Sequence, residues 1–275
     1  MESREPVRRL VVNADDFGRS SSINQAVIRA HRKGILTTAS LMVNGEACAE
    51  AVELARENPR LGVGLHLSLV CGRAALPVAA IPGLVNARGE FSDDPVGTGF
   101  RYFARRSLEP QLRAEIAAQW DKFRATGLVL DHVNGHLNLH LHPTVFRLVL
   151  EVGAELRRVR VTRDPFWLNA RLAGGLWGYR ASHALIFQWL SARARPRLRR
   201  LGIRHTRRVF GLLQNGRVDE AYVLALLRVL PTGDNELYSH PSMDVFRAEF
   251  DALVSPRVKA AVAGAGVELI RYQDL

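Results

Sequence analysis

Two adjacent carboxylates, Asp15 and Asp16, follow an apolar run near the N-terminus, in the sequence NADDFG at residues 13–18. Imidazoles stand in other apolar, β-branched runs: His66 lies in GLHL, and His240 lies in ELYSHP. A further group lies in LDHVNGHLNLHLHP and consists of His132, His136, His140 and His142. Six of the nine histidines therefore stand where buried strands are expected to end.

These residue types indicate metal-assisted hydrolysis. One carboxylate and two imidazoles, with coordination positions left open, suit a catalytic divalent cation better than a closed structural site. The cation offsets the repulsion between neighbouring carboxylates, which would otherwise raise the pKa of one of them. One Asp can then ligate the cation while its neighbour removes a proton from a water that attacks a carbonyl. A protonated histidine such as His240 can supply a proton to the leaving amine.

Seven short apolar runs alternate with longer stretches of helical periodicity, which favours a parallel sheet with crossover connections, either doubly wound or closed as a barrel. The candidate strands are Arg9–Asn13, Thr38–Val43, Gly62–Leu67, Val129–Asn134, Val159–Thr162, Glu236–His240 and Val267–Tyr272. In a barrel the carboxyl ends of such strands meet on one face, so the carboxylates and imidazoles would share one pocket. The Pro- and Gly-containing stretch 77–99 is predicted to be a long excursion from the barrel and a candidate cover of the active site.

Composition narrows the class of protein. A length of 275 residues and a hydrophobic fraction of 47% allow a sizeable core. The two cysteines, Cys48 and Cys71, match no zinc or redox spacing, and no secretory signal or membrane-spanning stretch is recognised. Neither GVGLHL nor GAGVEL completes a dinucleotide fingerprint, which argues against a nicotinamide or flavin enzyme. We expect a soluble cytoplasmic protein.

The positive charge is concentrated in one segment. Between Pro165 and Val218 the chain has eleven arginines and no acidic residue, while the rest of the chain has as many basic as acidic residues. Trp167, Trp177 and Trp189 lie in the same segment. Aromatic and aliphatic side chains beside arginines fit the surface of an anionic membrane. A solvated arginine-rich face and a dimer interface are the competing interpretations, and nucleic-acid binding is not expected because no recognisable motif accompanies the charge.

In combination, the motifs resemble those of the YdjC-like carbohydrate deacetylases, in order and over nearly the whole chain. They are NADDFG, HRKGILTTASLMVN, GLHLSLV, DHVNGHLNLHLHP, ELYSHP and the closing SPRVKAAVAGAGVELIRYQDL. The run DHVN followed by HLHPTV resembles most the hopanoid biosynthesis-associated branch, HpnK. The resemblance implies a distorted TIM-like (β/α) barrel that removes an N-acetyl group from an amino sugar with the aid of one divalent metal ion, Mg or Zn.

The resemblance also assigns site residues. By motif, Asp15 is similar to the general base and His240 to the general acid, while Asp16, His66 and His136 match the metal ligands. His140 and Arg160 match positions that bind the substrate or support the site. Relatives often have His at position 138 and Pro at position 162, where this chain has Asn138 and Thr162, and we expect these changes to alter the shape of the pocket.

We expect one domain over residues 1–275, with an Arg-rich helical insertion at about 166–208. The expected substrate is the N-acetylglucosaminyl head group of a hopanoid lipid, and the segment 166–208 would then attach the enzyme peripherally to the inner face of the membrane. A soluble chitooligosaccharide is the alternative substrate. A metal phosphoesterase is a second possible enzyme, but the sequence has neither a second cluster of metal ligands nor a phosphate-binding Gly loop to support it. A non-catalytic lipid-binding barrel is the alternative from another class, and the presence of both Asp15 and His240 argues against it, because binding alone would need neither residue.

Overall fold

The computed structural model describes residues 7–275. Residues 1–6 lie outside the described residues; they include the start of the predicted domain and of the N-terminal stretch in which no secretory signal was recognised. A parallel sheet forms its centre, with the strand order β4-β3-β2-β1-β6-β5. β7 pairs with Arg8–Val11 of β1, and β2 pairs with β1 from Asn13 onward. The strands are β1 (Arg8–Phe17), β2 (Thr38–Leu41), β3 (Gly62–Leu67), β4 (Leu130–Gly135), β5 (Arg208–Phe210), β6 (Gly233–Ser239) and β7 (Val267–Ile270).

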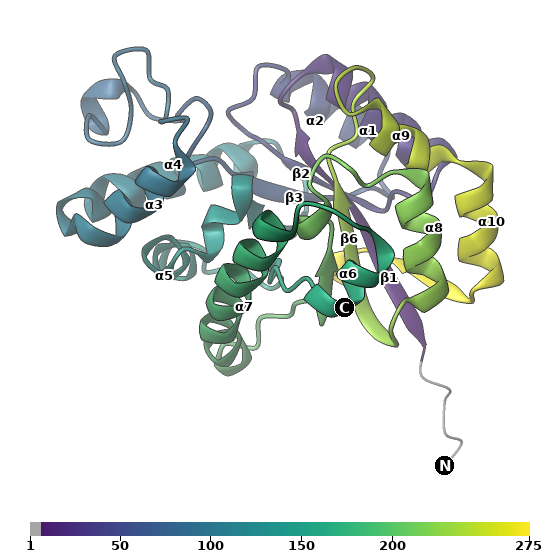
Figure 1. Ribbon diagram of the computed structural model, residues 1–275. Coiled ribbons are helices and arrows are strands. Elements are labelled where there is room, and N and C mark those ends of the chain that lie inside the picture. The colour runs from purple at the N-terminus through teal and green to yellow at the C-terminus, as the bar shows by residue number, and fades with distance from the viewer. Residues whose placement is uncertain (1–6) are drawn as a thin grey trace.

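Helices cover the outside of the sheet, which curls into a half-barrel (Figure 1). They are α1 (Ser21–Lys33), α2 (Cys48–Arg56), α3 (Pro95–Ala104), α4 (Glu109–Ala125), α5 (Pro143–Val152), α6 (Phe166–Leu172), α7 (Trp177–Arg200), α8 (Glu220–Val229), α9 (Arg247–Val254) and α10 (Pro256–Gly264). Short 3-10 helices are η1 (Val78–Ala80), η2 (Arg106–Leu108), η3 (His136–Leu141), η4 (Leu212–Gln214) and η5 (Tyr272–Asp274). The expected α/β fold, a distorted TIM-like barrel with a parallel sheet, is confirmed.

The central strand β1 has one apolar and one increasingly polar face. Leu10, Val12 and Ala14 belong to the main hydrophobic core. The alternate residues Val11, Asn13 and Asp15 point to the opposite face, because successive side chains of a strand alternate. This second face is the barrel interior, so the interior becomes polar toward the carboxyl end of β1.

The predicted strand Val159–Thr162 is wrong as a regular strand, although the segment lies in the expected place. It forms only isolated bridges, Val133 with Val159 and Arg158 with Arg204. The Arg160 N–H donates to the Val133 carbonyl, and the Val209 N–H donates to the Arg163 carbonyl. This irregular segment therefore spans the gap between β4 and β5 and carries Arg160 into the barrel. The sequence did not indicate the three-residue strand β5.

Two helices were also not predicted. The first is α3, which begins at Pro95, within the stretch 77–99 that was expected to be an excursion. The second is α9, which directly precedes α10. Residues 166–208 contain α6 and α7, but their assignment as an insertion stays a prediction. Within residues 7–275, no helix is both long and apolar enough to cross a bilayer.

Candidate active site

The carboxyl end of β1 is irregular, and this irregularity brings Asp15 and Asp16 to one place. The register between β1 and β2 shifts between Ala14 and Phe17, and Asp16 has a φ of 63°, in the left-handed region. Asp15 Oδ1 lies 3.9 Å from His66 Nδ1, and Asp16 Oδ1 lies 3.2 Å from His66 Nε2. On a regular strand two consecutive side chains would point to opposite faces. The bulge therefore allows both carboxylates to face the same histidine.

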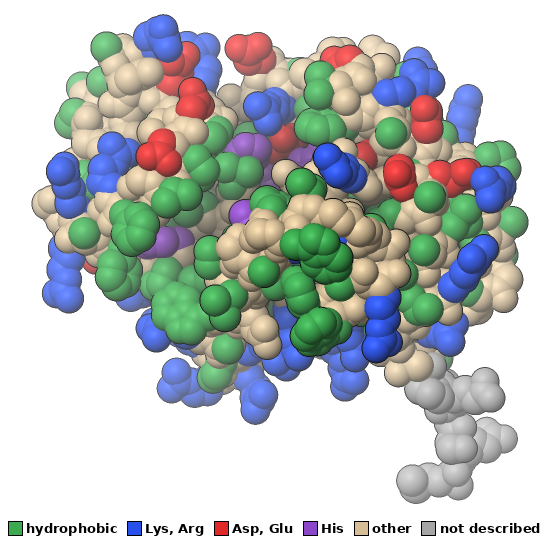
Figure 2. All heavy atoms as spheres, viewed as in Figure 1, with side chains coloured by type: hydrophobic (Ala, Val, Ile, Leu, Met, Phe, Trp, Pro, Cys, Tyr) green, Lys and Arg blue, Asp and Glu red, His purple; other side chains and the backbone are tan. Residues whose placement is uncertain are grey.

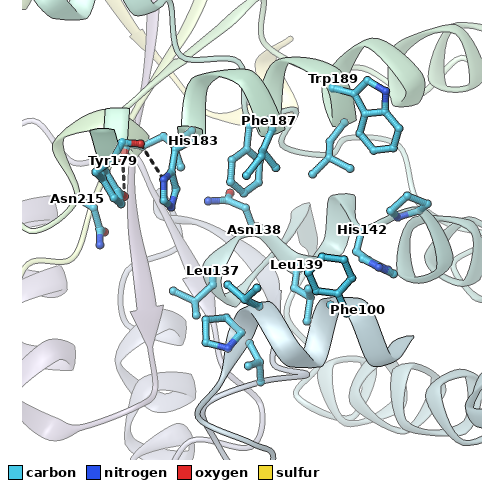
Figure 3. Close-up of a pocket in the computed structure, with 18 of the residues that line it drawn as sticks. Phe100, Leu137, Asn138, Leu139, His142, Tyr179, His183, Phe187, Trp189 and Asn215 are labelled. Carbon is cyan, nitrogen blue, oxygen red and sulfur yellow. Dashed lines mark hydrogen bonds between the residues drawn. The ribbon is translucent and has the colours of Figure 1, made fainter. Parts of the chain in front are cut away.

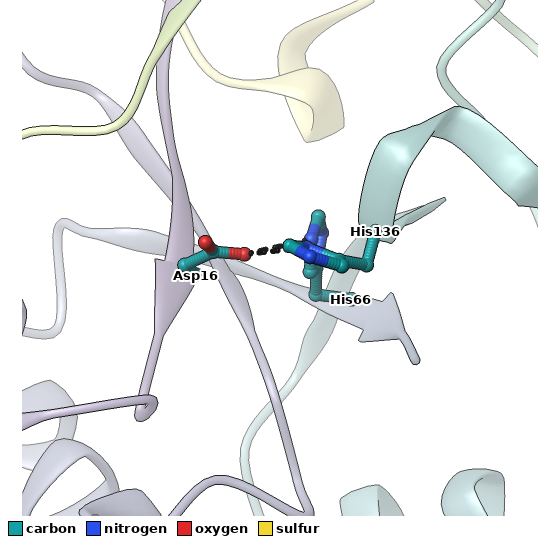
Figure 4. A group of neighbouring side chains, drawn as sticks. All are labelled: Asp16, His66 and His136. Carbon is teal, nitrogen blue, oxygen red and sulfur yellow. Dashed lines mark hydrogen bonds and ion pairs between the residues drawn. The ribbon is translucent and has the colours of Figure 1, made fainter. Parts of the chain in front are cut away.

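Asp16, His66 and His136 form a buried group whose ligand atoms all lie within 4.8 Å of one another (Figure 4). His66 comes from β3, and His136 is the first residue of η3, directly after β4. The distance from His136 Nδ1 to Asp16 Oδ1 is 2.9 Å. Burial disfavours the Asp16 carboxylate, but the hydrogen-bonded His136 outweighs it, and the pKa of Asp16 lies well below its usual value.

This donor set fits a divalent cation. His66 Nδ1 lies 2.7 Å from Asn134 Oδ1, a contact that requires the proton on Nδ1 and leaves the Nε2 lone pair free. Among the described residues, His66 Nε2 is a buried atom without a hydrogen-bond partner. A carboxylate and two imidazoles with remaining open positions are the ligands of a catalytic rather than a structural site. The group could therefore bind a metal ion, as expected.

Asp15 is held as a carboxylate by four donors. Arg160 Nη1 donates to Oδ2 at 2.6 Å, and Arg160 Nη2 donates to Oδ1 at 3.0 Å. The side-chain amides of Asn13 and Asn134 also donate to Oδ1, at 2.8 and 3.0 Å. Burial disfavours the charge, but the Arg160 guanidinium outweighs it and keeps the pKa of Asp15 far below its usual value. Asp15 is consequently ionised throughout the physiological pH range.

Glu236 is a site-supporting residue that sequence reasoning missed. It lies on β6 and accepts hydrogen bonds from Arg160 Nε at 2.9 Å and Nη2 at 2.7 Å, and from the Tyr272 hydroxyl. Glu236 and Arg160 are both fully buried, so the guanidinium is shared between two carboxylates. The available signal was a glutamate inside the apolar strand of ELYSHP, a place where an unpaired charge would be unfavourable.

The structure brings His240 to the same cavity as Asp15, at the start of the loop after β6. Its side chain is 17% exposed, and its Nδ1 lies 4.0 Å from the Glu249 carboxylate. The His240 N–H also donates to Glu249 Oε2 at 2.5 Å, which fixes the backbone there. An imidazole beside a cavity and near a carboxylate is suitably placed to carry a proton.

His140 is buried behind the site and does not line the cavity. Its Nε2 donates to the Arg160 carbonyl at 2.9 Å. Burial lowers the pKa of His140 to about 3, so the ring is neutral. His140 was expected either to bind the substrate or to support the site, and this geometry fits support of Arg160. Arg160 is fully buried, so its position fits a role in orienting Asp15 rather than in contacting the substrate.

A cavity of about 550 Å³ opens from Asp15 and His240. α7 runs along one side and α3 along the other, with Phe187 and Trp189 on α7 across from Phe100 (Figure 3). Its walls are mainly apolar, with a few polar groups such as Asn215. The wall formed by α3 was not foreseen, because the sequence indicated no helix there.

The two departures from the family pattern are in direct contact. The Thr162 hydroxyl donates to Asn138 Oδ1 at 2.7 Å, and Asn138 lines the cavity. Leu137 and Asn138 have φ values of 51° and 56°, a left-handed turn that places both side chains at the cavity wall. The expectation that these positions shape the pocket fits this contact.

Comparison with known proteins gives a family match over most of the chain. The family model described as YdjC-like protein matches residues 9–264. Two curated relatives described as carbohydrate deacetylase, from Brevibacillus brevis and Geobacillus stearothermophilus, are 40% identical over 150 residues and 39% identical over 153 residues. Each alignment covers 54% of this chain and 57% or 58% of the relative, so the chain spans little more than half the length of the curated relatives it matches.

A solved structure supports the fold independently. A protein of Enterococcus faecalis V583, provisionally described as a cellobiose-phosphate cleavage protein, has a TM-score of 0.74 to this chain. The comparison covers 98% of both chains at 22% sequence identity. At this identity the likeness concerns the architecture and leaves the reaction to be argued from the site.

Proposed function

The chain belongs to the YdjC-like family, and from this premise we propose that it is a metal-dependent carbohydrate deacetylase, a hydrolase that removes the N-acetyl group from an amino sugar. The names of the curated relatives support the reaction class. The observation that carries the proposal is the buried Asp16, His66 and His136 group beside the separately held carboxylate of Asp15.

In the proposed reaction, a water adds to the acetamide carbonyl carbon and the C–N bond breaks, which gives acetate and a free amine. Asp16, His66 and His136 would hold the cation, which when bound polarises the carbonyl and makes a water more acidic. Imidazole donors favour Zn²⁺, whereas Mg²⁺ prefers oxygen ligands, so we propose zinc first and magnesium as the other candidate.

Asp15 would take the proton from the attacking water. Its Oδ1 already accepts three hydrogen bonds, while Oδ2 accepts one, so Oδ2 is the atom with capacity for the proton. A carboxylate of such low pKa is a weak base and can act only on a water of raised acidity. His240, at the same cavity, would donate the proton that the leaving amine requires.

For the substrate we propose an amino sugar linked to a lipid, the N-acetylglucosaminyl head group of a hopanoid. The apolar wall beyond Asp15 supports this choice, because Leu139, Phe187 and Leu190 offer no partners for sugar hydroxyls. A soluble chitooligosaccharide is the second candidate, and the resemblance to the hopanoid-associated branch favours the lipid. A non-catalytic lipid-binding barrel would leave the four donors on Asp15 without a function.

The test is mass spectrometry of N-acetylglucosaminyl bacteriohopanetetrol after incubation with metal-loaded protein. A chelated sample and the Asp15→Asn variant serve as controls. Loss of one acetyl group only with metal and with Asp15 present would support the proposal. No loss from this lipid, combined with acetate release from chitooligosaccharides, would overturn the lipid substrate. No acetate from either substrate in a protein with bound metal would overturn the deacetylase.

A further inference from the structure

Large apolar side chains are exposed around the mouth of the cavity, on two helices that are far apart in the sequence. They are Val96, Phe100 and Phe103 on α3, and Leu185, Ile186 and Trp189 on α7, and we call these six residues the mouth surface. All of them except Leu185 line the cavity. Phe100 is 72% exposed and Trp189 is 53% exposed. On α3 the three residues have the i, i+4, i+7 spacing of one helix face. Phe103 contacts the His142 ring, but all three side chains are at least 65% exposed, so internal packing accounts for little of the apolar character of this face.

Exposed arginines flank the mouth surface. On the C-terminal half of α7 they are Arg193, Arg197, Arg199 and Arg200, and after α3 they are Arg105 and Arg106. None of these six forms an ion pair with a carboxylate anywhere in residues 7–275. The Arg193 guanidinium lies 5.1 Å from the centre of the Trp189 ring. Figure 2 shows hydrophobic side chains gathered around histidines on this face, with Lys and Arg side chains along the lower edge.

A second hollow, of about 260 Å³, lies beside the cavity. It is lined by Arg193 and Arg197 together with apolar side chains that include Phe146 and Leu190. Leu190 lines both hollows, so the two are neighbours along α7. A hollow lined by two arginines and by apolar side chains matches the phosphate and acyl parts of an anionic lipid.

We propose that the mouth surface and its flanking arginines form a docking surface for an anionic lipid bilayer. The aromatic and aliphatic side chains enter the boundary between head groups and acyl chains, and the arginines bind the anionic head groups. The cavity then opens directly toward the membrane. Docking does not depend on the deacetylase assignment, because neither Asp15 nor the Asp16 group belongs to this surface.

The charge favours a membrane over a second copy of this chain. In a two-fold dimer the same patch meets itself, so the arginines of one copy would lie close to those of the other. No carboxylate occurs in residues 166–217 to compensate this repulsion. An anionic bilayer supplies the opposite charge to these arginines.

Flotation with phosphatidylcholine vesicles, with and without phosphatidylglycerol, tests the proposal. We expect the protein to float with the anionic vesicles. The variant Arg193→Ser/Arg197→Ser/Arg200→Ser should lower the partition constant about a hundredfold, since each arginine near an anionic surface contributes about fivefold. Phe100→Ser/Trp189→Ser should also weaken binding, through the loss of apolar contact alone.

Matched controls remove equal charge elsewhere. Arg29, Arg60 and Arg228 are exposed and lie outside α3 and α7. The variant Arg29→Ser/Arg60→Ser/Arg228→Ser should bind the anionic vesicles as well as wild type does. Asp15→Asn should float as wild type while losing turnover, which separates this proposal from the proposed function. The proposal is overturned if wild type does not float, if the control variant loses binding equally, or if Phe100→Ser/Trp189→Ser abolishes a dimer in sedimentation without changing flotation.

Discussion

Arg160 donates one hydrogen bond to each carboxylate oxygen of Asp15, with Nη1 2.6 Å from Oδ2 and Nη2 3.0 Å from Oδ1. This bidentate arrangement fixes the plane of the carboxylate as well as its charge. The same guanidinium also binds Glu236, so the orientation of Asp15 depends on a buried network that reaches Tyr272 near the C-terminus. Asp15 is thus positioned by residues from the whole length of the chain.

Asp15→Asn should abolish most turnover without releasing the metal. The amide cannot take a proton, and its NH2 group would face donors that now bind the carboxylate. We expect the rate of acetate release to fall at least about a hundredfold, the usual contribution of a general base. Metal content by elemental analysis should equal that of wild type. A fully active Asp15→Asn protein would show that another group is the base.

Asp16→Ala and His66→Ala should each lower metal affinity more than about a hundredfold, because loss of a ligand should exceed the 10–100-fold loss seen when a ligand's supporting partner is removed. Equilibrium dialysis with Zn²⁺ measures this directly. His142→Ala is the matched control, since His142 lies on the outer cavity wall and outside the Asp16 group. Equal zinc binding by all three variants would contradict the proposed ligand set.

Arg160→Met should destabilise the fold by about 3–5 kcal/mol, because it leaves the buried carboxylates of Asp15 and Glu236 without their cation. Urea unfolding at neutral pH gives the difference in free energy of unfolding. Adding Glu236→Gln removes one uncompensated charge and should restore part of the loss. If the double variant were the less stable of the two, the charge argument would be incorrect.

Asp164 predicts a pH dependence of stability that is separate from the site. Burial raises the pKa of Asp164 from 3.8 to about 7. The folded state therefore holds a proton that the unfolded state has lost, so stability decreases as pH rises from about 4 to 7. Between pH 5 and 7 the effect is about 2 kcal/mol, by the linkage relation. Asp164→Asn should lack this slope, and urea unfolding of both proteins at the two pH values tests it; parallel slopes would count against a protonated Asp164.

Strand ends predicted that the two aspartates and several histidines share one pocket, because carboxyl ends of parallel strands converge whatever the details of the strands. The choice of Asp16, His66 and His136 among them came from the resemblance to the YdjC-like family. The role of Glu236 was not predicted, because its contact with Arg160 joins residues far apart in the sequence and forms only in the folded barrel. β5 has three residues, too few for a periodic signal.

α3 was missed for a different reason. It contains Gly97 and Gly99 and follows a stretch rich in Pro and Gly, so local propensity argues against a helix. Its start is stabilised by Pro95 at the first turn and by Asp94, whose side chain accepts hydrogen bonds from the Val96 and Gly97 N–H groups. Tyr102 anchors its other end, with its hydroxyl donating to the Leu69 carbonyl. Tertiary contacts of this kind leave no period in the sequence.

The proposed reacting groups and the outer cavity walls lie on different elements, and this separation has an evolutionary consequence. The strands and their ends carry every group that would break the amide, whereas α3 and α7 supply only the walls beyond it. Mutations in Phe100, Phe187 or Trp189 can therefore change which molecule is admitted while Asp15 and its partners stay in place. Substitutions in these two helices would therefore alter the choice of substrate and leave the residues of the proposed reaction unchanged.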